Sequence, residues 1–162
     1  MGSSVWSRAA AHLLVAPVIA PVRVTSDATA LFLEQTRPTR TARIGVLGPE
    51  AGEVLSALWR RGFKRAEAAR SAHPTPDHEE VRLDLLFVAG STSAERATLS
   101  IANTAAGLKC GGALVVDLAA MPADAEGAAL IARLAPLGFN ERPALLPHMQ
   151  ILADKVGEPV PD

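Results

Sequence analysis

The chain has 162 residues, enough for one domain of ordinary size, and 49% of them are hydrophobic. This apolar fraction excludes a wholly disordered chain, and 16 basic against 17 acidic side chains give no bulk positive charge of the kind that nucleic-acid binders usually carry. A single cysteine excludes an internal disulfide and a four-thiolate zinc site. With no tyrosine and 4% aromatic residues, few side chains are present on which bases or sugars could stack.

The N-terminal stretch has an unusual composition. No acidic residue precedes Asp27, and serine, arginine and alanine are frequent there, which is typical of mitochondrial transit peptides. The alternative is an alanine-rich helix followed by an extended segment that packs on the domain. The longest apolar run, 13–22, contains two prolines and is shorter than the ~20 residues that cross a bilayer. The composition therefore leaves a cytoplasmic and a mitochondrial location open and predicts no transmembrane segment.

Two short helices are expected before the main domain. The first covers residues 5–15, and the second covers 28–35, where Ser26 or Asp27 can serve as the N-cap. The polar stretch 36–41 contains a proline and predicts the connection into the next unit. We therefore divide the chain into an N-terminal helical or extended segment, 1–41, and an α/β domain, 42–162.

From residue 42 onward, apolar runs of strand length alternate with amphipathic helices. The runs predict strands over 43–47, 63–69, 81–89, 113–118 and, as one or two strands with a hairpin around Pro147, within 144–156. The helical patterns cover 50–61, 93–107 and 123–137, and glycines follow or end them at Gly62, Gly107 and Gly138. Such alternation predicts an α/β fold with a largely parallel sheet between two layers of helices.

Three further details complete the expected fold. In the first helix of the α/β domain, the apolar face consists of Val54, Leu55, Leu58 and Trp59. The dipeptide Gly111–Gly112 predicts a turn before the strand at 113–118, and the stretch 71–80 predicts a surface loop. Right-handed crossovers should then place Gly48, Gly90 and residues 117–118 along one edge of the sheet, because each of them follows or ends a parallel strand.

The order of three motifs resembles the class I S-adenosylmethionine-dependent methyltransferase fold. Residues 44–52, Ile-Gly-Val-Leu-Gly-Pro-Glu-Ala-Gly, are similar to its opening strand, glycine loop and helix, and residues 83–89 are similar to its fourth strand. Residues 108–116 are similar to the Leu-Lys-Pro-Gly-Gly turn before its fifth strand, with Cys110 in place of the proline. The resemblance covers roughly 43–156 and implies a three-layer, Rossmann-like sheet. Too few residues lie between 69 and 81 for the family's next helix and third strand, so we expect a sheet shortened at that edge.

The resemblance implies a cleft for S-adenosylmethionine, intact or vestigial. The residues that would line it are Gly48, Glu50, Gly52, Gly90 and Ser91. In the family, an acid on the first strand precedes glycines that let the backbone approach the cofactor; here the acid's position is Val46 and the middle glycine's is Glu50. A glutamate there adds bulk and negative charge beside the place that the resemblance gives to the cofactor's carboxylate, which is unfavourable without a cation between them.

The residues that would hold the ribose also depart from the family. Its second strand ends in an acid that accepts both ribose hydroxyls, whereas the matching residues here are Ala68, Ala69 and Arg70, and an arginine accepts no hydrogen bond. Glu67 should point to the same face as Ala69 and could serve only after a shift in register. The structural alternative for Gly48 and Gly52 is a tight strand-to-helix turn, and for Glu50 an acid that complements the helix dipole.

Other groups of residues each have a structural alternative. The loop 73–80 gathers two histidines and three acids, but nothing in it enforces convergence, so we expect solvated acids and no metal. Residues 91–93, Ser-Thr-Ser, can cap the helix that follows, or hold a phosphate with backbone amides. Two basic runs, 37–43 and 60–65, fit either an acidic partner or solvated charge.

Two hypotheses for the function follow. In the first, which we favour, the chain is a methyltransferase-like domain that has lost S-adenosylmethionine binding and catalysis and acts as an accessory or structural subunit of a larger assembly, with no catalytic residue. In the second, it is a small active S-adenosylmethionine-dependent methyltransferase of unidentified substrate. A nucleotide-binding Rossmann domain is a weaker alternative, because the Gly-x-Gly-x-x-Gly fingerprint is absent.

The first hypothesis implies protein partners and no nucleic acid. The apolar residues before the α/β domain are more than a short extension normally leaves in water, so we expect part of them to contact another chain. They are Trp6, Leu13, Leu14, Val18, Ile19, Leu31, Phe32 and Leu33.

Overall fold

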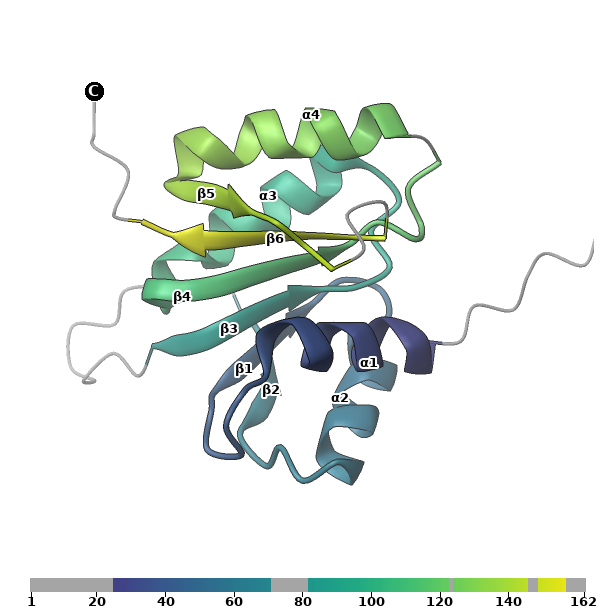
Figure 1. The fold of residues 1–162 in the computed structure, drawn as a ribbon, viewed down its shortest axis with the longest axis vertical. Helices are drawn as coiled ribbons and strands as arrows, with labels where there is room; N and C mark the ends of the chain where they lie inside the picture. Colours follow the sequence, from purple (N-terminus) through teal and green to yellow (C-terminus); the bar gives the residue numbers. More distant parts are fainter. Residues whose placement is uncertain (1–24, 71–81, 123, 146–148, 157–162) are drawn as a thin grey trace, which may run out of the picture.

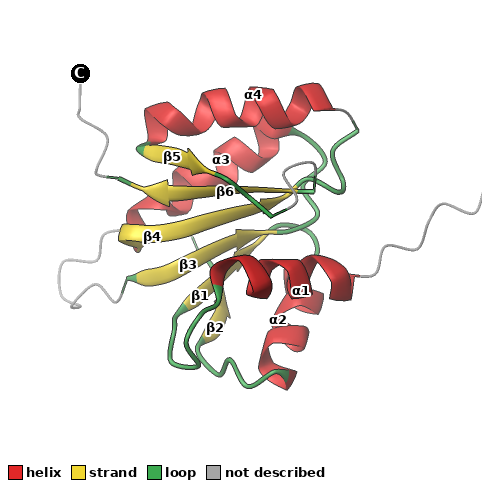
Figure 2. Ribbon diagram, viewed as in Figure 1, coloured by secondary structure: helices red, strands yellow, loops and turns green. Residues whose placement is uncertain are grey.

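The computed structural model describes residues 25–70, 82–122, 124–145 and 149–156, within which helices pack on both faces of one sheet (Figures 1 and 2). The α-helices are α1 Thr25–Thr36, α2 Ala51–Arg60, α3 Ala94–Thr104 and α4 Asp124–Leu134, and two 3-10 helices are η1 Ala105–Gly107 and η2 Ala135–Leu137. The strands are β1 Ile44–Leu47, β2 Ala66–Ala68, β3 Leu83–Val88, β4 Leu108–Asp117, β5 Phe139–Arg142 and β6 Gln150–Lys155.

The sheet has the strand order β2-β1-β3-β4-β6-β5. Strands β2, β1, β3 and β4 are parallel, whereas β6 runs antiparallel to both β4 and β5. The predicted α/β class with a largely parallel sheet is confirmed. In the described part of the chain, the three-residue strand β2 forms one edge of the sheet, which agrees with the shortening expected on this side.

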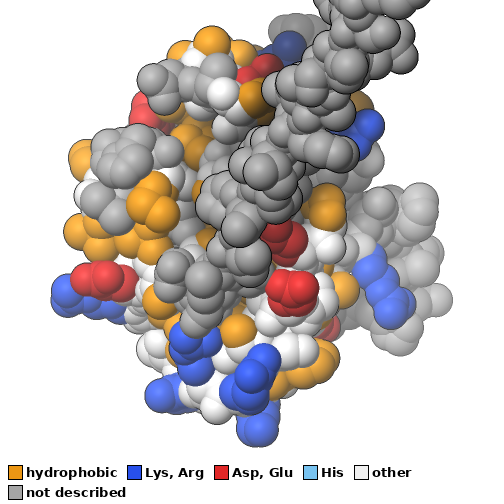
Figure 3. Space-filling view, turned by 90° about the vertical axis from the view of Figure 1, so that its right-hand side faces the viewer, with side chains coloured by type: hydrophobic (Ala, Val, Ile, Leu, Met, Phe, Trp, Pro, Cys, Tyr) orange, Lys and Arg blue, Asp and Glu red, His pale blue; other side chains and the backbone are white. Residues whose placement is uncertain are grey.

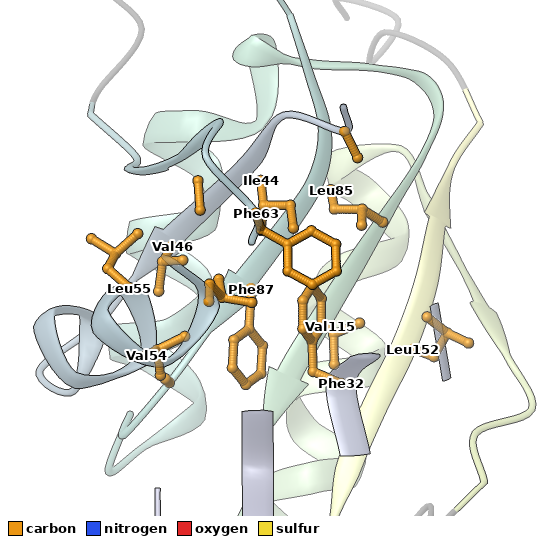
Figure 4. Close-up of a cluster of buried hydrophobic side chains, with 14 residues drawn as sticks. Phe32, Ile44, Val46, Val54, Leu55, Phe63, Leu85, Phe87, Val115 and Leu152 are labelled. Atoms are coloured by element: carbon orange, nitrogen blue, oxygen red, sulfur yellow. The ribbon is translucent and has the colours of Figure 1, made fainter. Parts of the chain in front are cut away.

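Each face of the sheet carries its own hydrophobic cluster, because the central strands are apolar on both faces. Under α1 and α2, Phe32 stacks on Phe87 of β3 with ring centroids 4.6 Å apart and planes 15° apart (Figure 4). On the other face, Ile101 of α3 and Leu130 of α4 pack on Leu114 of β4. The three layers of the predicted architecture are therefore present (Figure 1).

Helix α1 is part of this folded unit, although the sequence pattern assigns it to the N-terminal segment. Leu31 and Phe32 are buried in the chain's own core and are not left for a partner. The side chain of Gln150, fully buried in β6, accepts a hydrogen bond from Gln35 at 2.5 Å and donates one to the carbonyl of Ala28 at 2.9 Å. A buried amide that satisfies both its ends in this way ties the helix to the sheet.

Several expected boundaries shift. The described helix α1 already includes Ser26 and Asp27, so neither residue precedes it as an N-cap. The final hairpin exists, but its first strand is β5, which ends at Arg142, before the segment 144–156 predicted to hold it. The helix expected at 5–15 and the loop expected at 71–80 lie outside the described residues.

The turn predicted at Gly111–Gly112 is wrong, because β4 continues through both glycines. The register between β3 and β4 passes from Leu83–Leu108 to Leu85–Ala113, so β4 advances five residues where β3 advances two. β4 therefore has three extra residues in an irregular stretch of strand, larger than a simple β-bulge, and Gly111 has a φ of +76° there. The two glycines thus allow an irregular stretch within β4, whereas the sequence pattern predicts that this strand starts after them.

Helical spacing predicts that Trp59 lies on the buried face of α2, and this is wrong. Val54, Leu55 and Leu58 are buried, whereas 45% of Trp59 is exposed. Its indole nitrogen donates to the carbonyl of Ala66 at 2.9 Å. Because Arg65 and Ala69 form hydrogen bonds with β1, the carbonyl of Ala66 faces the outer side of β2. Trp59 therefore covers part of an open sheet edge, a device that limits pairing with other chains.

No helix among the described residues is long and apolar enough to span a bilayer.

Candidate functional site

The topology places the candidate site at the carboxyl ends of β1 and β3. These two strands are neighbours, but the chain leaves β1 toward β2 on one side and leaves β3 toward β4 on the other. Open α/β sheets bind their ligands outside such a switch point. Gly48 follows β1, Gly90 follows β3, and Asp117 ends β4, so the predicted alignment of these three positions along one edge is confirmed. We call Gly48, Glu50, Ala89 and Gly90 the strand-end site.

Gly48 is a glycine because two strand ends meet at it. Its φ is +100°, and a Cβ atom at this position would overlap the carbonyl oxygen of Ala89. The amide of Ala89 also donates to the carbonyl of Leu47 at 2.9 Å, which holds the two ends together. The close approach that the glycine permits is therefore made by the protein's own backbone, which is the strand-to-helix turn of the structural alternative.

Glu50 lies across the strand-end site. It occupies the N-cap position of α2, makes no side-chain capping hydrogen bond, and is half-buried. A Cβ atom at Gly90 would lie 2.7 Å from Cγ and 3.0 Å from Cδ of Glu50, so this side chain rests on the glycine that ends β3. The acid in the first turn of α2 is Glu53. Glu50, the predicted dipole partner, thus lies just before the first turn, and its side chain reaches from the end of β1 to that of β3.

Gly52 and Ser91, the other predicted site residues, have different surroundings. Gly52 is exposed on α2 and a Cβ atom there would meet nothing within 4 Å, so no close approach requires this glycine. Ser91 is buried after β3. The structure therefore places Glu50 on Gly90 and Gly48 against Ala89, the residue before Gly90, and leaves Gly52 at the solvent.

The amides at the start of α3 are bound by the protein itself. The hydroxyl of Ser93 accepts from the amide of Arg96 at 3.3 Å, which confirms the capping alternative for this serine. The carboxylate of Glu126 in α4 accepts from the amide of Ala94 at 2.6 Å. Reasoning from the sequence missed Glu126, because no local pattern links residues 32 positions apart. With these two acceptors in place, the helix start has fewer free donors for a phosphate.

The positions expected to hold an acid in the family have other roles here. Val46 is 1% exposed and belongs to the hydrophobic cluster under α2 (Figure 4). Glu67, on the edge strand β2, forms an ion pair with Arg43 at 3.1 Å. Glu67 and Ala69 both line a cavity of about 470 Å³, together with Ala68, Arg70, Leu83 and Gly107. The predicted shared face of Glu67 and Ala69 stays a prediction, because consecutive residues line this cavity. This cavity lies along β2 and the starts of β3 and β4, away from the strand-end site.

The remaining candidates contribute no further site. His12, the acidic loop 73–80 and His148 lie outside the described residues, and within the described ranges no three His, Cys, Asp or Glu side chains are grouped as metal ligands. Cys110 is exposed in β4.

Comparison with known proteins identifies the fold. No protein-family sequence model matches the chain, and no curated protein sequence matches it significantly. Among solved structures, the chain resembles a Streptococcus pneumoniae protein assigned as a tRNA (m1A22) methyltransferase, in complex with S-adenosyl-L-methionine, with a TM-score of 0.50, 12% identity, and coverage of 85% of this chain and 74% of that one.

Two further structures are similar at lower scores. Human N-acetylserotonin methyltransferase has a TM-score of 0.49 and 13% identity, over 83% of this chain and 52% of that chain. CalS10, an amino pentose methyltransferase from Micromonospora echinaspora, has a TM-score of 0.48 and 12% identity, over 81% and 89%. The similarity to the Streptococcus pneumoniae structure, together with the strand order, shows that the chain has a class I S-adenosylmethionine-dependent methyltransferase-like fold.

The fold implies S-adenosylmethionine as a cofactor, and three observations test whether the residues present fit it. The Cβ position of Gly90 is taken by the side chain of Glu50 and that of Gly48 by the carbonyl of Ala89, although Gly48 itself is exposed. The strand position of the expected acid is the buried Val46. The acid nearest the end of β2, Glu67, is engaged by Arg43. These residues do not match the donors and the open glycine loop that the cofactor needs.

Proposed function

We propose that this chain keeps the methyltransferase scaffold, binds S-adenosylmethionine weakly or not at all, and acts as an accessory or structural subunit of a larger assembly. The observation that carries the proposal is the position of Glu50 on Gly90. A cofactor that entered at the switch point would have to displace this side chain and would then bring its own carboxylate close to that of Glu50. Two carboxylates in a partly dry site repel each other unless a cation lies between them.

Titration of the protein with S-adenosylmethionine in a calorimeter tests the proposal. We expect no measurable heat of binding for the unmodified chain. Glu50→Gly removes both the bulk and the charge and should raise the affinity by about tenfold or more, the effect of relieving one unfavourable charge contact. Glu50→Gln keeps the bulk and removes the charge, so it separates the two causes.

Glu53→Gly is the matched control, because it removes a carboxylate and adds a glycine one turn further along α2 without opening the strand-end site. It should leave the affinity unchanged. Tight binding by the unmodified chain, together with transfer of a methyl group to any acceptor, would overturn the proposal in favour of an active methyltransferase.

The accessory role also predicts a partner for the segment before α1. Phe32 is part of the core, so a deletion that tests this has to end before Thr25. We expect residues 25–162 to fold, and the full chain to bind more of a hydrophobic dye such as ANS, because apolar side chains of the segment await a partner. Equal dye binding by the two forms would mean that the segment is covered by its own domain, and the accessory role would lose this support.

A further inference from the structure

Six exposed basic side chains gather at one end of the molecule, and we call them the basic face. They are Arg37, Arg40, Arg60, Arg61, Lys64 and Arg65. They come from two stretches of the sequence, around the α1–β1 connection and around the end of α2. Figure 3 shows Lys and Arg side chains gathered at the lower end of the molecule, the end at which Figure 1 places α2 and these connections.

Tertiary contacts hold the two stretches together. The guanidinium of Arg40 lies 4.9 Å from the centroid of the Phe63 ring, a cation–π contact between the α1–β1 connection and the loop after α2. Arg65, on the α2–β2 connection, donates to the carbonyl of Thr41 at 3.3 Å. These contacts restrain the side chains before any partner arrives, which lowers the entropy lost on binding.

Within the described residues, no ion pair offsets the positive charge of this face, although Arg65 also attracts the carboxylate of Asp84 at longer range. The ion pairs there join Arg43 to Glu67, Lys109 to Asp84 and Arg142 to Asp154, and none includes a residue of the basic face. Outside the basic face, the described residues include 8 basic and 12 acidic side chains, an excess of four negative charges. The positive excess of the described part of the chain therefore lies on this face.

Complementing the dipole of α2 explains only part of the face. Arg60 and Arg61 donate to carbonyls of the last turn, those of Ser56 and Ala57, at 3.2 and 3.4 Å. Cations at a helix C-terminus are stabilised in this way. The guanidinium of Arg40 also lies at this helix end, because a Cβ atom at Gly62 would be 2.9 Å from its Nη1. Lys64 and Arg65 follow the helix, and no hydrogen bond joins their side chains to carbonyls of its last turn.

The composition of the face favours a protein partner over a nucleic acid. Trp59, 45% exposed, precedes Arg60 on α2 and contacts the carbonyl of Ala66, the residue after Arg65. Arginine and tryptophan dominate the energetics of protein–protein interfaces. A nucleic-acid strand would extend beyond six cations onto a surface with an excess of negative charge, whereas an acidic cluster on a protein fits within the face.

We propose that the basic face, with Trp59 at its border, is the docking surface for an acidic segment of a partner protein. It lies before the amino ends of β1 and β2, opposite the strand-end site, so the proposal does not depend on whether S-adenosylmethionine binds.

Binding of fluorescently labelled poly-L-glutamate to the full chain, measured by anisotropy at low ionic strength, tests the surface. Arg61→Gln/Lys64→Gln should weaken binding by about tenfold, roughly threefold for each cation. The matched control, Arg96→Gln/Arg133→Gln, makes the same change in net charge at exposed positions on α3 and α4 and should leave the affinity unchanged. In a Trp6→Phe background, Trp59 is the only remaining indole, and its fluorescence should change on binding.

The possible outcomes separate the alternatives. Equal loss in both double variants would overturn the proposal, because binding would then follow net charge and not this face. Binding of poly-uridylate at the same salt concentration with equal or higher affinity would overturn it in favour of a nucleic-acid partner. Unchanged Trp59 fluorescence at saturation would exclude Trp59 from the surface.

Discussion

The two edges of the parallel strands use their polar side chains differently. At the carboxyl edge, these groups contact the protein: Ser93 and Glu126 accept from the amides of α3, Asp117 accepts from the amide of Ala119, and Glu50 rests on Gly90. At the amino edge of β1 and β2, the side chains of the basic face are exposed, and none of them forms an ion pair with another described residue, although several also contact the protein's own carbonyls or the Phe63 ring. At the edge where this fold normally binds its ligands, the side chain of Glu50 lies on Gly90. Position in a fold therefore does not by itself identify a working site.

The largest expected effect on stability comes from a substitution at the carboxyl edge. Gly48→Ala puts a Cβ atom onto the carbonyl of Ala89 and forces alanine to a φ of +100°, so we expect the free energy of unfolding to fall by at least about 3 kcal/mol. Urea denaturation measures it. Gly52→Ala, in the open first turn of α2, should instead stabilise the chain by about 0.5–1 kcal/mol. Similar losses in both variants would contradict the assignment of Gly48 to a packed turn.

A second variant sharpens the comparison within the amino edge, where one cation is buried. Lys155 is 2% exposed, and its ammonium group donates to the carbonyls of Ala105 and Leu108 at 2.6 and 2.8 Å. Lys155→Met leaves both carbonyls without this donor, so we expect a loss of about 1–3 kcal/mol in thermal or urea unfolding. Lys64→Met, on the exposed basic face, should change stability by less than about 0.5 kcal/mol. An unchanged free energy of unfolding in Lys155→Met would mean that other donors replace the ammonium group.

The smallest expected effect is a change in the pH dependence of stability that is caused by an acidic residue at the amino edge. Asp84 accepts from the ammonium of Lys109 at 2.5 Å and from the amide of Arg43 at 2.7 Å, and these contacts, the lysine's foremost, hold its pKa below the ordinary value although burial opposes them. The unfolded chain therefore binds this proton more readily. The stabilisation is complete above the unfolded pKa of about 3.9 and is lost as the pH falls through the lower folded value.

In Asp84→Asn, the free energy of unfolding should accordingly fall less steeply as the pH is lowered below about 4. Its pH dependence near neutral pH should be unchanged. Unfolding at several pH values between about 2 and 7 measures this. Asp154→Asn, which removes an acid paired with Arg142 on the other side of the sheet, is the comparison. An unaltered acid limb in Asp84→Asn would contradict the contribution assigned to this carboxylate.

The sequence by itself determined the alternation of strands and helices, the parallel centre of the sheet and the glycines that end its strands. These features depend on local patterns, since buried strands are runs of apolar residues and a positive φ favours glycine at Gly48 and Gly90. Local pattern also predicted the departures at Val46 and Glu50. It failed where a pattern has two local solutions: Gly111 and Gly112 suit a turn or a bulge, and Trp59 suits a core or a sheet edge.

Only the tertiary structure decided what these residues contact. The contact of Glu50 with Gly90, the bond from Ala94 to Glu126 and the gathering of two basic runs each join positions far apart in the chain. Likewise, α1 belongs to the core because Phe32 stacks on Phe87, 55 positions later. Such contacts depend on the order in which strands pair and on which face of the sheet each helix covers. The hydrophobic periodicity determines neither the strand order nor the face that each helix covers, because it specifies an element's type and buried side but not its neighbour.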